Sequence, residues 1–354
     1  MNQLRIAQVA PLYESVPPKL YGGTERVVSF LTEELVSKGH HVTLFASGDS
    51  ITRARLVSVC DRSLRLNGDC VDQLVHHIAM LQLVLDESDH FDVVHFHIDY
   101  LHFPLSRLMR LPHVTTLHGR LNIPDLKPFY NIFKDMPVVS ISQEQRKPLE
   151  EINWVGNVYH GLPENLFKPN YNPGRYLAFL GRISREKGVD RAIEMAIRSD
   201  IPLKIAAKID KNDQEYFEQH IKKLIDHPLI EFIGEISEPE KNEFLGNAIC
   251  LLFPINWLEP FGLVMIESLA CGTPVVAYRK GSVPELIDHG VSGFIVDNQD
   301  DAVKAVKNIG LLDRQECRRV FEERFTAARM ATDYLKVYSR TLELERDMYD
   351  LKLI

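Results

Sequence analysis

Two carboxylates stand eight residues apart in the segment EPFGLVMIE, which runs from Glu259 to Glu267. Pro260 and the apolar residues Leu263 and Val264 predict the start of a buried helix. A continuous helix of that length spans roughly 12 Å. A ligand with a polar group at each end, such as a sugar joined to a nucleoside through a diphosphate, has a similar length. One ligand shared by both carboxylates is therefore one interpretation of the pair.

A second interpretation of the pair needs no ligand. Acidic residues are favoured at helix starts, so Glu259 could stabilise the helix dipole while Glu267 faces solvent. However, the sequence SLACGTPVVAY that follows is typical of a packed helix end and a strand. It leaves Glu267 few directions toward solvent, and a buried carboxylate needs a partner or a ligand.

The loop GRISREKG, which follows the strand-like segment RYLAFL, is a second candidate site. Gly181 and Gly188 bound the loop, and Arg182 and Lys187 lie within it. Asp190 is expected to cap the helix that follows. Two cations beside a helix start are suited to binding a diphosphate. The spacing of a Walker loop is absent, so ATPase chemistry is not indicated. An exposed loop of salt bridges is the alternative.

Paired glycines in KLYGGTERVV form a third candidate site. Gly22 and Gly23 precede a helix that Thr24 is expected to cap. Glycines let the backbone approach a ligand closely and present N–H groups to an anion. The GxGxxG pattern of nicotinamide-binding domains is absent. A tight turn between a strand and a helix, without a ligand, is the alternative.

Histidines are concentrated in residues 1–160, which hold eleven of the fourteen. His95 and His97 in VVHFHIDY point the same way in an extended strand, and with His102 and His118 they could bind a metal. No Asp or Glu completes a usual ligand spacing, so a metal site is disfavoured. His118, at the end of HVTTLHG, lies where a strand would deliver a polar group into a cleft.

Composition limits the class of protein. The chain has 354 residues, 45% hydrophobic and 25% charged, which predicts two domains of a soluble protein. A formal net charge of −8 argues against a nucleic-acid partner. Five cysteines without CxxC spacing indicate reduced thiols in a cytoplasmic protein. The start MNQLRIAQVAP predicts a strand rather than a signal peptide, and no apolar run reaches membrane-spanning length.

Two short basic stretches leave the question of membrane contact open. ITRARLVSV (residues 51–59) and RLMR (residues 107–110) carry positive charge that could touch a membrane surface. A solvated protein face explains them about as well. The expected location is the cytoplasm, with the inner face of the membrane as the alternative.

Short apolar runs alternate with longer amphipathic segments along the chain, which predicts parallel sheets covered by helices. In the first half the expected strands are RIAQVAP, HVTLFAS, FDVVHFH, HVTTLHG and PVVSIS, and the expected helices are TERVVSFLTEELVSKG and DQLVHHIAMLQLVLDES. The second half repeats the pattern with strands RYLAFLG, PLKIAAK, IEFIGE, ICLLFP, TPVVAY and GFIVD and helices VDRAIEMAIRS, DQEYFEQHIKKLID and EPEKNEFLGNA.

The alternation stops at NVYHGLPENLFKPNYNPG, residues 157–174, whose Pro, Gly and Asn content is typical of a domain boundary. The predicted fold class is α/β, with one domain over residues 1–161 and a similar one over residues 162–334. Twin domains of this class bind ligands in the crevice at their strand ends. The last segment, residues 335–354, predicts a helix beyond the second sheet.

The segments GRISREKG, EPFGLVMIE, GTPVVAY and GSVPELI resemble, in order and spacing, those of glycosyltransferase family four, the retaining enzymes of GT-B fold. YGGTERVV, DVVHFH and TTLHG agree with that family's first domain, so the resemblance covers nearly the whole chain. It implies two Rossmann-like domains facing across a cleft, an acceptor-side N-terminal domain and a C-terminal domain that binds a nucleotide sugar. The terminal segment resembles the family's return helix, which packs on the first domain.

The resemblance implies roles for the segment EPFGLVMIE. Glu267 would hold the ribose hydroxyls of the donor, and Glu259 would face the hydroxyls of the transferred sugar. Backbone N–H groups between them would meet the sugar and the distal phosphate, and they belong to Phe261, Gly262 and Leu263.

It also implies how the diphosphate would be bound. Arg182 and Lys187, on the loop that begins at Gly181, would neutralise the leaving group in place of a metal ion. The turn at Gly22 and Gly23 would close over the phosphates from the first domain.

His118 would lie beside the anomeric carbon, and with Glu259, Arg182 and Lys187 it makes up the implied catalytic set. Main-chain atoms around Ile233 and Gly234 would be near the base. After LKIA the family usually has a glycine, where this chain has Ala207 and Lys208.

The expected activity is transfer of a hexose from a nucleotide diphosphate sugar to an acceptor hydroxyl, with retention and with no metal or other cofactor. UDP-glucose is the first donor expected, and GDP-mannose is the reserve. A sugar-nucleotide epimerase of the same fold and a non-catalytic nucleotide-sugar-binding module are the alternatives. The intact Glu pair and Arg–Lys pair disfavour the second of these. The acceptor, whether a carbohydrate, a lipid-linked compound or a small molecule, cannot be identified from the sequence.

Overall fold

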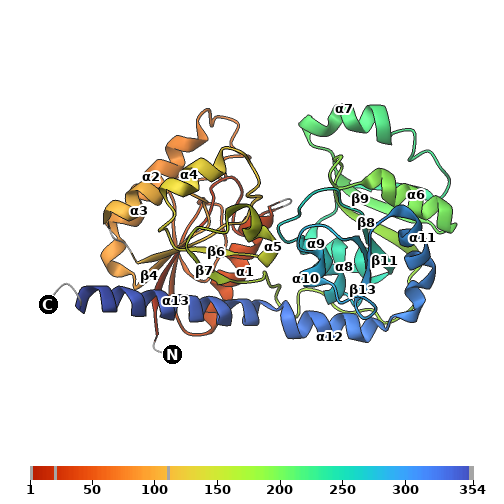
Figure 1. Ribbon diagram of the computed structural model, residues 1–354. Coiled ribbons are helices and arrows are strands. Elements are labelled where there is room, and N and C mark those ends of the chain that lie inside the picture. Colours follow the sequence, from red (N-terminus) through yellow and green to blue (C-terminus); the bar gives the residue numbers. More distant parts are fainter. Residues whose placement is uncertain (1–2, 20–21, 110–111, 351–354) are drawn as a thin grey trace. The chain divides into compact units, whose positions relative to one another are not determined.

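The computed structural model describes residues 3–19, 22–109 and 112–350, and the chain forms two compact units (Figure 1). Unit 1 consists of Met1–Gly161 and Ala327–Ile354, and unit 2 of Leu162–Thr326. The last helix, α13 (Ala327–Asp350), begins before residue 335, where the sequence analysis placed its start. Positions 20 and 21 of the predicted glycine turn and position 110 of the basic stretch RLMR lie outside the described residues.

Unit 1 is built on a seven-stranded parallel sheet of order β3-β2-β1-β4-β5-β6-β7. The strands are β1 (Arg5–Val9), β2 (His41–Phe45), β3 (Arg55–Val57), β4 (Val93–Phe96), β5 (His113–Thr116), β6 (Val138–Ser140) and β7 (Trp154–Asn157). Its other helices are α1 (Gly23–Ser37), α2 (Gln73–Asp86), α3 (Phe103–Met109), α4 (Leu126–Ile132) and α5 (Gln143–Arg146). Strands β3 and β7 were not predicted, because they are short and lack a fully buried apolar run.

Helices cover both faces of this sheet, as the apolar strands require. Helix α1 packs against α13, which also contacts β5 and β7. The cluster that contains Met80 and Val84 joins α2 to β1 and β4, and the cluster around Phe103 and Tyr130 joins α3 to α4. A sheet buried on both faces explains why β4 is buried along its whole length.

Unit 2 is built on a six-stranded parallel sheet of order β10-β9-β8-β11-β12-β13. The strands are β8 (Tyr176–Arg182), β9 (Leu203–Lys208), β10 (Ile230–Gly234), β11 (Ala248–Phe253), β12 (Val275–Tyr278) and β13 (Gly293–Val296). The helices are α6 (Val189–Ser199), α7 (Gln214–Tyr216), α8 (Glu238–Gly246), α9 (Leu263–Ala270), α10 (Val283–Leu286), α11 (Gln299–Asn308) and α12 (Arg314–Arg324). The helix expected over residues 213–226 is interrupted, since a π-helical turn, Phe217–Ile221, follows α7.

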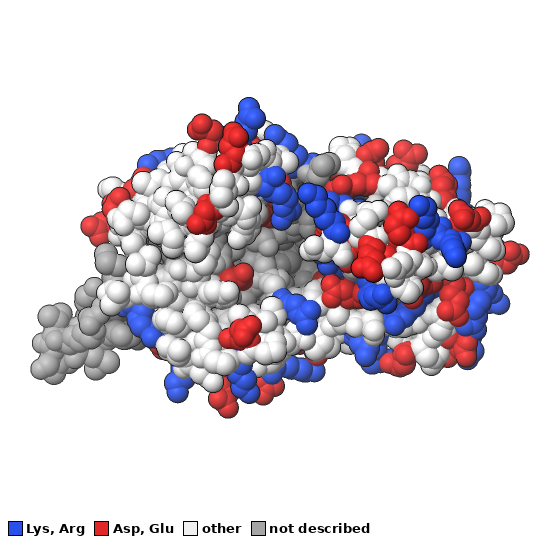
Figure 2. Space-filling view, turned by 90° about the horizontal axis from the view of Figure 1, so that it is seen from above, with Lys and Arg blue, Asp and Glu red and all other residues white. Residues whose placement is uncertain are grey.

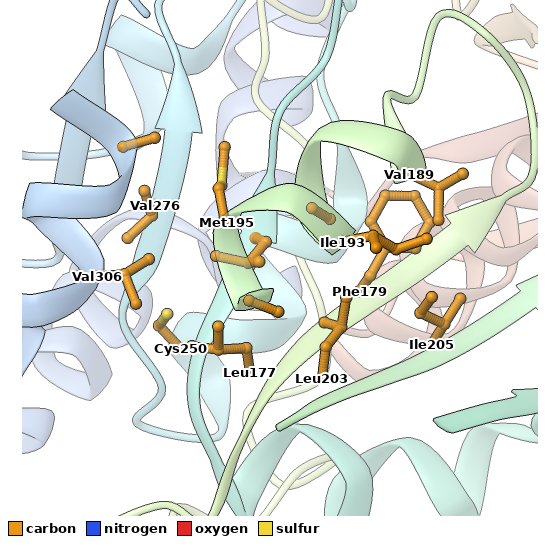
Figure 3. Packing of buried hydrophobic residues seen from close by; sticks show 14 of the residues in the cluster. Leu177, Phe179, Val189, Ile193, Met195, Leu203, Ile205, Cys250, Val276 and Val306 are labelled. Carbon is orange, nitrogen blue, oxygen red and sulfur yellow. The ribbon is translucent and has the colours of Figure 1, made fainter. Parts of the chain in front are cut away.

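The core of unit 2 lies between the sheet and helices α6 and α11 (Figure 3). Val189 and Ile193 of α6 belong to the same buried cluster as Phe179 of β8 and Ile205 of β9. Their spacing of four residues places both α6 side chains on one face of the helix. This packing fixes the start of α6 against the end of β8, where the loop GRISREKG lies.

Charge on the described surface is mixed in sign. Acidic and basic side chains are interspersed on the face shown in Figure 2. In the stretch ITRARLVSV, Arg53 pairs with Glu33 at 2.6 Å and Arg55 with Glu87 at 2.7 Å. Each of these two guanidinium groups therefore has a carboxylate partner within unit 1. None of the described helices is long and apolar enough to cross a bilayer.

Candidate active site

The order of strands in unit 2 determines where its loops can hold a ligand. The chain runs outward in one direction from β8 to β9 and β10, and in the other from β11 to β12 and β13. In such a sheet the ligand site lies at the carboxyl ends of the two central strands. The loops that follow β8 and β11 contain Lys187 and Glu259, so the topology brings these predicted residues to one edge.

These two loops are fastened to each other by their backbones. The N–H of Asn256 donates to the carbonyl oxygen of Glu186 at 2.8 Å. Gly188, the N-cap of α6, has a φ of +70°, and a Cβ there would lie 2.3 Å from the carbonyl oxygen of Pro254. Only glycine tolerates both the left-handed backbone and the close approach. Asp190, expected as the cap, instead lies in the first turn of α6.

Lys187 and Glu259 meet directly across the two loops. The Lys187 ammonium donates to Glu259 Oε2 at 2.5 Å, and the two side chains are only 20% and 11% exposed. The ammonium also lies over the Trp257 ring, 5.2 Å from its centroid. A cation and a carboxylate that are both largely desolvated interact more strongly than a surface pair.

The segment between the two carboxylates is not one continuous helix, which corrects the span expected from the sequence. Helix α9 begins at Leu263, and Gly262 is its N-cap with a φ of +85°. Pro260 and Phe261 therefore lie in a loop before the helix. That loop is held by Ser282, whose hydroxyl donates to the carbonyl oxygen of Phe261 at 2.6 Å. The N–H groups of the first turn of an α-helix point out of its end and are suited to an anion, and in α9 this turn begins with Leu263 and Val264.

Glu267, on the second turn of α9, is buried as the sequence indicated, being 3% exposed. Its carboxylate accepts from the Lys241 ammonium of helix α8 at 2.8 Å, and Lys241 lies 3.3 Å from Glu238. The partner that a buried carboxylate requires is thus a lysine on a neighbouring helix.

Arg182, at the carboxyl end of β8, lies among three carboxylates. Its guanidinium nitrogens are 3.1 Å from Glu186, 3.5 Å from Asp210 and 3.7 Å from Asp213. The side chain remains 32% exposed. Arg182 therefore lies in a locally acidic environment, whereas among the described residues Lys187 pairs with one carboxylate, that of Glu259.

The remaining predicted residues of unit 2 lie at other points of the same edge. Gly181 is the second-last residue of β8, with open space where a side chain would be. Ile233 and Gly234 end β10, the edge strand, two strands away from β8. Gly234 has a φ of +79° and open space beside its Cα, and Ile233 is 37% exposed.

Gly22, Gly23 and His118 belong to unit 1. Gly22 is the N-cap of α1 and Gly23 its first residue, so Thr24 lies inside the first turn and is not the cap. A Cβ on Gly22 would lie 2.7 Å from Pro18. This contact accounts for the glycine at position 22 even when no ligand is bound.

His118 follows β5 and is held by two other imidazoles. Its Nε2 lies 2.9 Å from His97 Nδ1, and its ring stacks on that of His160 with centroids 5.2 Å apart. Burial lowers the pKa of His118 to about 3, so the ring is neutral at physiological pH.

Three of the four histidines considered as metal ligands are hydrogen-bonded at both ring nitrogens. His95 and His102 bond to protein groups through both ring nitrogens, and so does His97. Within the described residues no group of three or more His, Cys, Asp or Glu side chains has the arrangement of a metal site.

Several residues that hold the predicted site residues in place were not themselves predicted. Lys241 and Ser282 act across separate helices and loops, and no local pattern signals such pairings. Gln8 bonds to His97, and its polar side chain inside the apolar strand RIAQVAP was a signal that could have been used.

Comparison with known proteins matches a glycosyltransferase family model to each of the two units. Residues 21–137 match the model of Glycosyltransferase Family 4, and residues 163–325 match that of the Glycosyl transferases group 1. N-acetyl-alpha-D-glucosaminyl L-malate synthase of Bacillus anthracis is 24% identical, over 92% of this chain and 96% of its own.

Solved structures agree over nearly the full length. AviGT4, a glycosyltransferase involved in avilamycin A biosynthesis, has a TM-score of 0.76 at 22% identity, covering 96% of this chain and 98% of its own. HepE of Anabaena, solved with UDP and glucose, has a TM-score of 0.74 at 16% identity, covering 96% of this chain and 100% of its own.

The two parallel sheets with their helices are thus those of the GT-B fold. The chain belongs to the glycosyltransferases of family 4.

Proposed function

We propose that this enzyme transfers a hexose from a nucleotide diphosphate sugar, UDP-glucose in the first instance, to an acceptor hydroxyl with retention of configuration. The observation that carries the proposal is the buried pair of Lys187 and Glu259 beside the start of helix α9, with Glu267 on the same helix. A cation, helix N–H groups and two carboxylates are the groups that a diphosphate flanked by two sugars requires.

In this proposal each group has one task. Glu267 accepts hydrogen bonds from the ribose, and Glu259 accepts them from the transferred sugar. The backbone N–H groups of Phe261, Gly262 and Leu263 bind the sugar and the distal phosphate.

Arg182 and Lys187, with the backbone at Gly181, stabilise the charge that develops on the departing diphosphate. The cation at Lys187 is fixed by the protein, so the leaving group needs no divalent metal.

The other predicted residues take the tasks that the family resemblance implies. Main-chain atoms of Ile233 and Gly234 contact the base, and the Gly22–Gly23 backbone contacts the phosphates. His118 orients the transferred sugar.

Retention follows from a front-face route. The bond from the anomeric carbon to the phosphate oxygen breaks while the acceptor oxygen bonds to the same face, and the phosphate oxygen takes the acceptor proton. Glu259 is already paired with Lys187 and serves the sugar hydroxyls, so it is not the nucleophile of a double displacement.

The choice of UDP-glucose is supported by a structural neighbour. HepE has been solved with UDP and glucose and with UDP-glucose. GDP-mannose is the second donor to be tested.

The deciding experiment is a thermal-shift panel of UDP, GDP and ADP with their sugars, followed by product analysis. A donor at a hundred times its Kd adds about 2.7 kcal/mol to the free energy of unfolding. We expect UDP-glucose to give the largest shift and an α-linked product in proton NMR. A β-linked first product, or a trapped glycosyl adduct on Glu259, would refute the proposed route.

Three further outcomes separate the alternatives. Loss of transfer in EDTA with recovery in Mn²⁺ would refute metal independence. Conversion of the donor sugar to its epimer without an acceptor would indicate an epimerase. Binding with no turnover against any acceptor hydroxyl, in a panel of sugars and polyols, would favour the non-catalytic module.

A further inference from the structure

Unit 1 contains a buried row of hydrogen bonds that ends at His118. Gln8 of β1 donates through Nε2 to the Tyr338 hydroxyl at 3.1 Å, and its Oε1 lies 2.8 Å from His97 Nε2. His97 Nδ1 in turn lies 2.9 Å from His118 Nε2. Gln8 and Tyr338 are fully buried and His97 is 2% exposed, so water does not compete for these bonds.

A second branch leaves the same tyrosine. The hydroxyl of Tyr338 lies 2.7 Å from His95 Nδ1, and His95 Nε2 lies 2.7 Å from Thr116 Oγ1. Thr116 is 2.9 Å from the Tyr334 hydroxyl, which also comes from α13. The last helix therefore anchors both branches through two tyrosines.

The row has a direction because each member has limited donors and acceptors. Burial holds the pKa values of His95 and His97 well below the usual range, so each ring carries one proton and one lone pair. With the Gln8 amide donating to Tyr338, its oxygen must accept from His97 Nε2–H. His97 Nδ1 is then an acceptor, so His118 must donate through Nε2–H.

The remaining nitrogen of His118 is thereby defined as well. A neutral ring protonated at Nε2 has its lone pair at Nδ1. His118 Nδ1 is buried and has no hydrogen-bond partner within the described part of the chain. Reversing the Gln8 amide would reverse every bond of the row and make this atom a donor.

We propose that Gln8, His97 and Tyr338 are positioning residues that hold His118 in the Nε2–H tautomer and so keep its Nδ1 as a hydrogen-bond acceptor. The ligand group that this atom suits is a hydroxyl of the donor sugar, which donates to Nδ1. The assignment of that hydroxyl rests on the proposed function, whereas the tautomer itself does not.

The test is ¹⁵N NMR of the full chain with labelled histidine, using long-range proton–nitrogen correlations that distinguish the two tautomers. His118→Ala identifies the His118 signals. We expect the Nε2–H pattern for His118 and His97 in the wild type. An Nδ1–H pattern for His118 would overturn the proposal.

Three variants test the row itself. Tyr338→Phe removes the hydroxyl that orients Gln8, and Gln8→Leu removes the amide. We expect both to abolish the single tautomer at His118. Tyr334→Phe lies on the same helix at the end of the other branch, is equally buried, and should leave the His118 pattern unchanged. An unaltered His118 tautomer in both Tyr338→Phe and Gln8→Leu would refute the inference.

Kinetics then link the tautomer to transfer. We expect Tyr338→Phe to lower kcat roughly 10- to 100-fold with little change in KM, because the sugar is misoriented and not lost. Tyr334→Phe should retain the wild-type kcat. If the NMR pattern is as expected but His118→Ala keeps full activity, the proposed role of His118 fails while the tautomer assignment is upheld.

Discussion

Lys187 and Glu259 show how a predicted binding residue can carry a folding cost. An exposed loop of salt bridges is the alternative that the sequence offers for GRISREKG, and in such a loop truncating the lysine would barely affect folding. Instead the lysine and its partner are 20% and 11% exposed. Removing the cation therefore leaves a largely buried carboxylate without its partner, which costs about 1–3 kcal/mol.

We expect Lys187→Ala to lower kcat roughly 100- to 1,000-fold, as removal of one fixed donor to developing charge does. It should also lower the unfolding free energy by about 1–3 kcal/mol. Steady-state kinetics and chemical denaturation measure the two effects. Adding Glu259→Gln to Lys187→Ala removes the unpaired charge, so the double variant should regain stability but not activity.

Lys222→Ala, in an exposed pair with Glu218, is the matched control and should change neither quantity measurably. An unaltered kcat in Lys187→Ala would remove the lysine from the proposed site.

Glu25 in the first turn of α1 gives a prediction about pH. Burial, with a smaller contribution from Glu14, raises its pKa from 4.5 to about 7. The native state then binds a proton that the unfolded chain has released, so stability falls as pH rises from about 4.5 to about 7. Glu25→Gln should remove this slope and be more stable than the wild type at pH 8 by about 3 kcal/mol at most.

Denaturation at pH 4.5 and pH 8 in a Trp257→Phe background checks this, because Trp154 then reports on unit 1 alone. Glu151→Gln, an exposed change, should keep the wild-type slope. A slope that persists in Glu25→Gln would assign the titration to another group.

At the scale of elements, the loops that follow β8 and β11 meet at Gly188, where only a residue without a side chain fits. We expect Gly188→Ala to destabilise unit 2 by more than about 1 kcal/mol, since the added methyl group meets the Pro254 carbonyl and the backbone is left-handed. Donor affinity, measured by calorimetry with UDP-glucose, should fall with it because Lys187 and Glu259 lie on the two loops.

Gly310→Ala is the control, because a methyl group there meets nothing within 4 Å. It should leave both stability and affinity unchanged. Equal effects of the two substitutions would mean that the loop contact is not what Gly188 preserves.

The sequence predicted the elements whose burial is periodic and missed those that depend on distant neighbours. Strands such as β4 and β12 are buried along their whole length, and the apolar residues of α6 recur with helical spacing. The caps at Thr24 and Asp190 were wrong because glycines at the preceding turns begin both helices. The pairing of Lys241 with Glu267 could not be predicted, since the two residues are 26 positions apart and lie on different helices.

At the scale of the molecule, the two units differ in how the chain completes them. Unit 2 is one continuous segment of the chain and has its own hydrophobic core. Its two ends meet where the Leu162 N–H donates to the Phe325 carbonyl oxygen at 2.9 Å. Unit 1 needs α13, because Tyr334 and Tyr338 are fully buried against its strands.

We therefore expect a fragment of residues 162–326 to unfold cooperatively, as followed by Trp257 fluorescence, and to bind UDP. A fragment of residues 1–161 should not, because Gln8, His95 and Thr116 would lose their tyrosine partners. Adding back a peptide of residues 327–354 should restore cooperative unfolding. Cooperative unfolding of the 1–161 fragment alone would contradict this account of unit 1.

Helix α13 follows unit 2 in the sequence although it belongs to unit 1, and this order has a consequence during synthesis on the ribosome. Residues 1–161 emerge before unit 2, yet the helix that fills their buried face is translated only after the 165 residues of Leu162–Thr326. At the usual elongation speed this takes roughly 10–30 s. Through that interval the imidazoles and the apolar strands of the nascent segment lack their covering helix. The second-translated unit is thus the first that can finish folding, and the earlier segment is a natural client for chaperones.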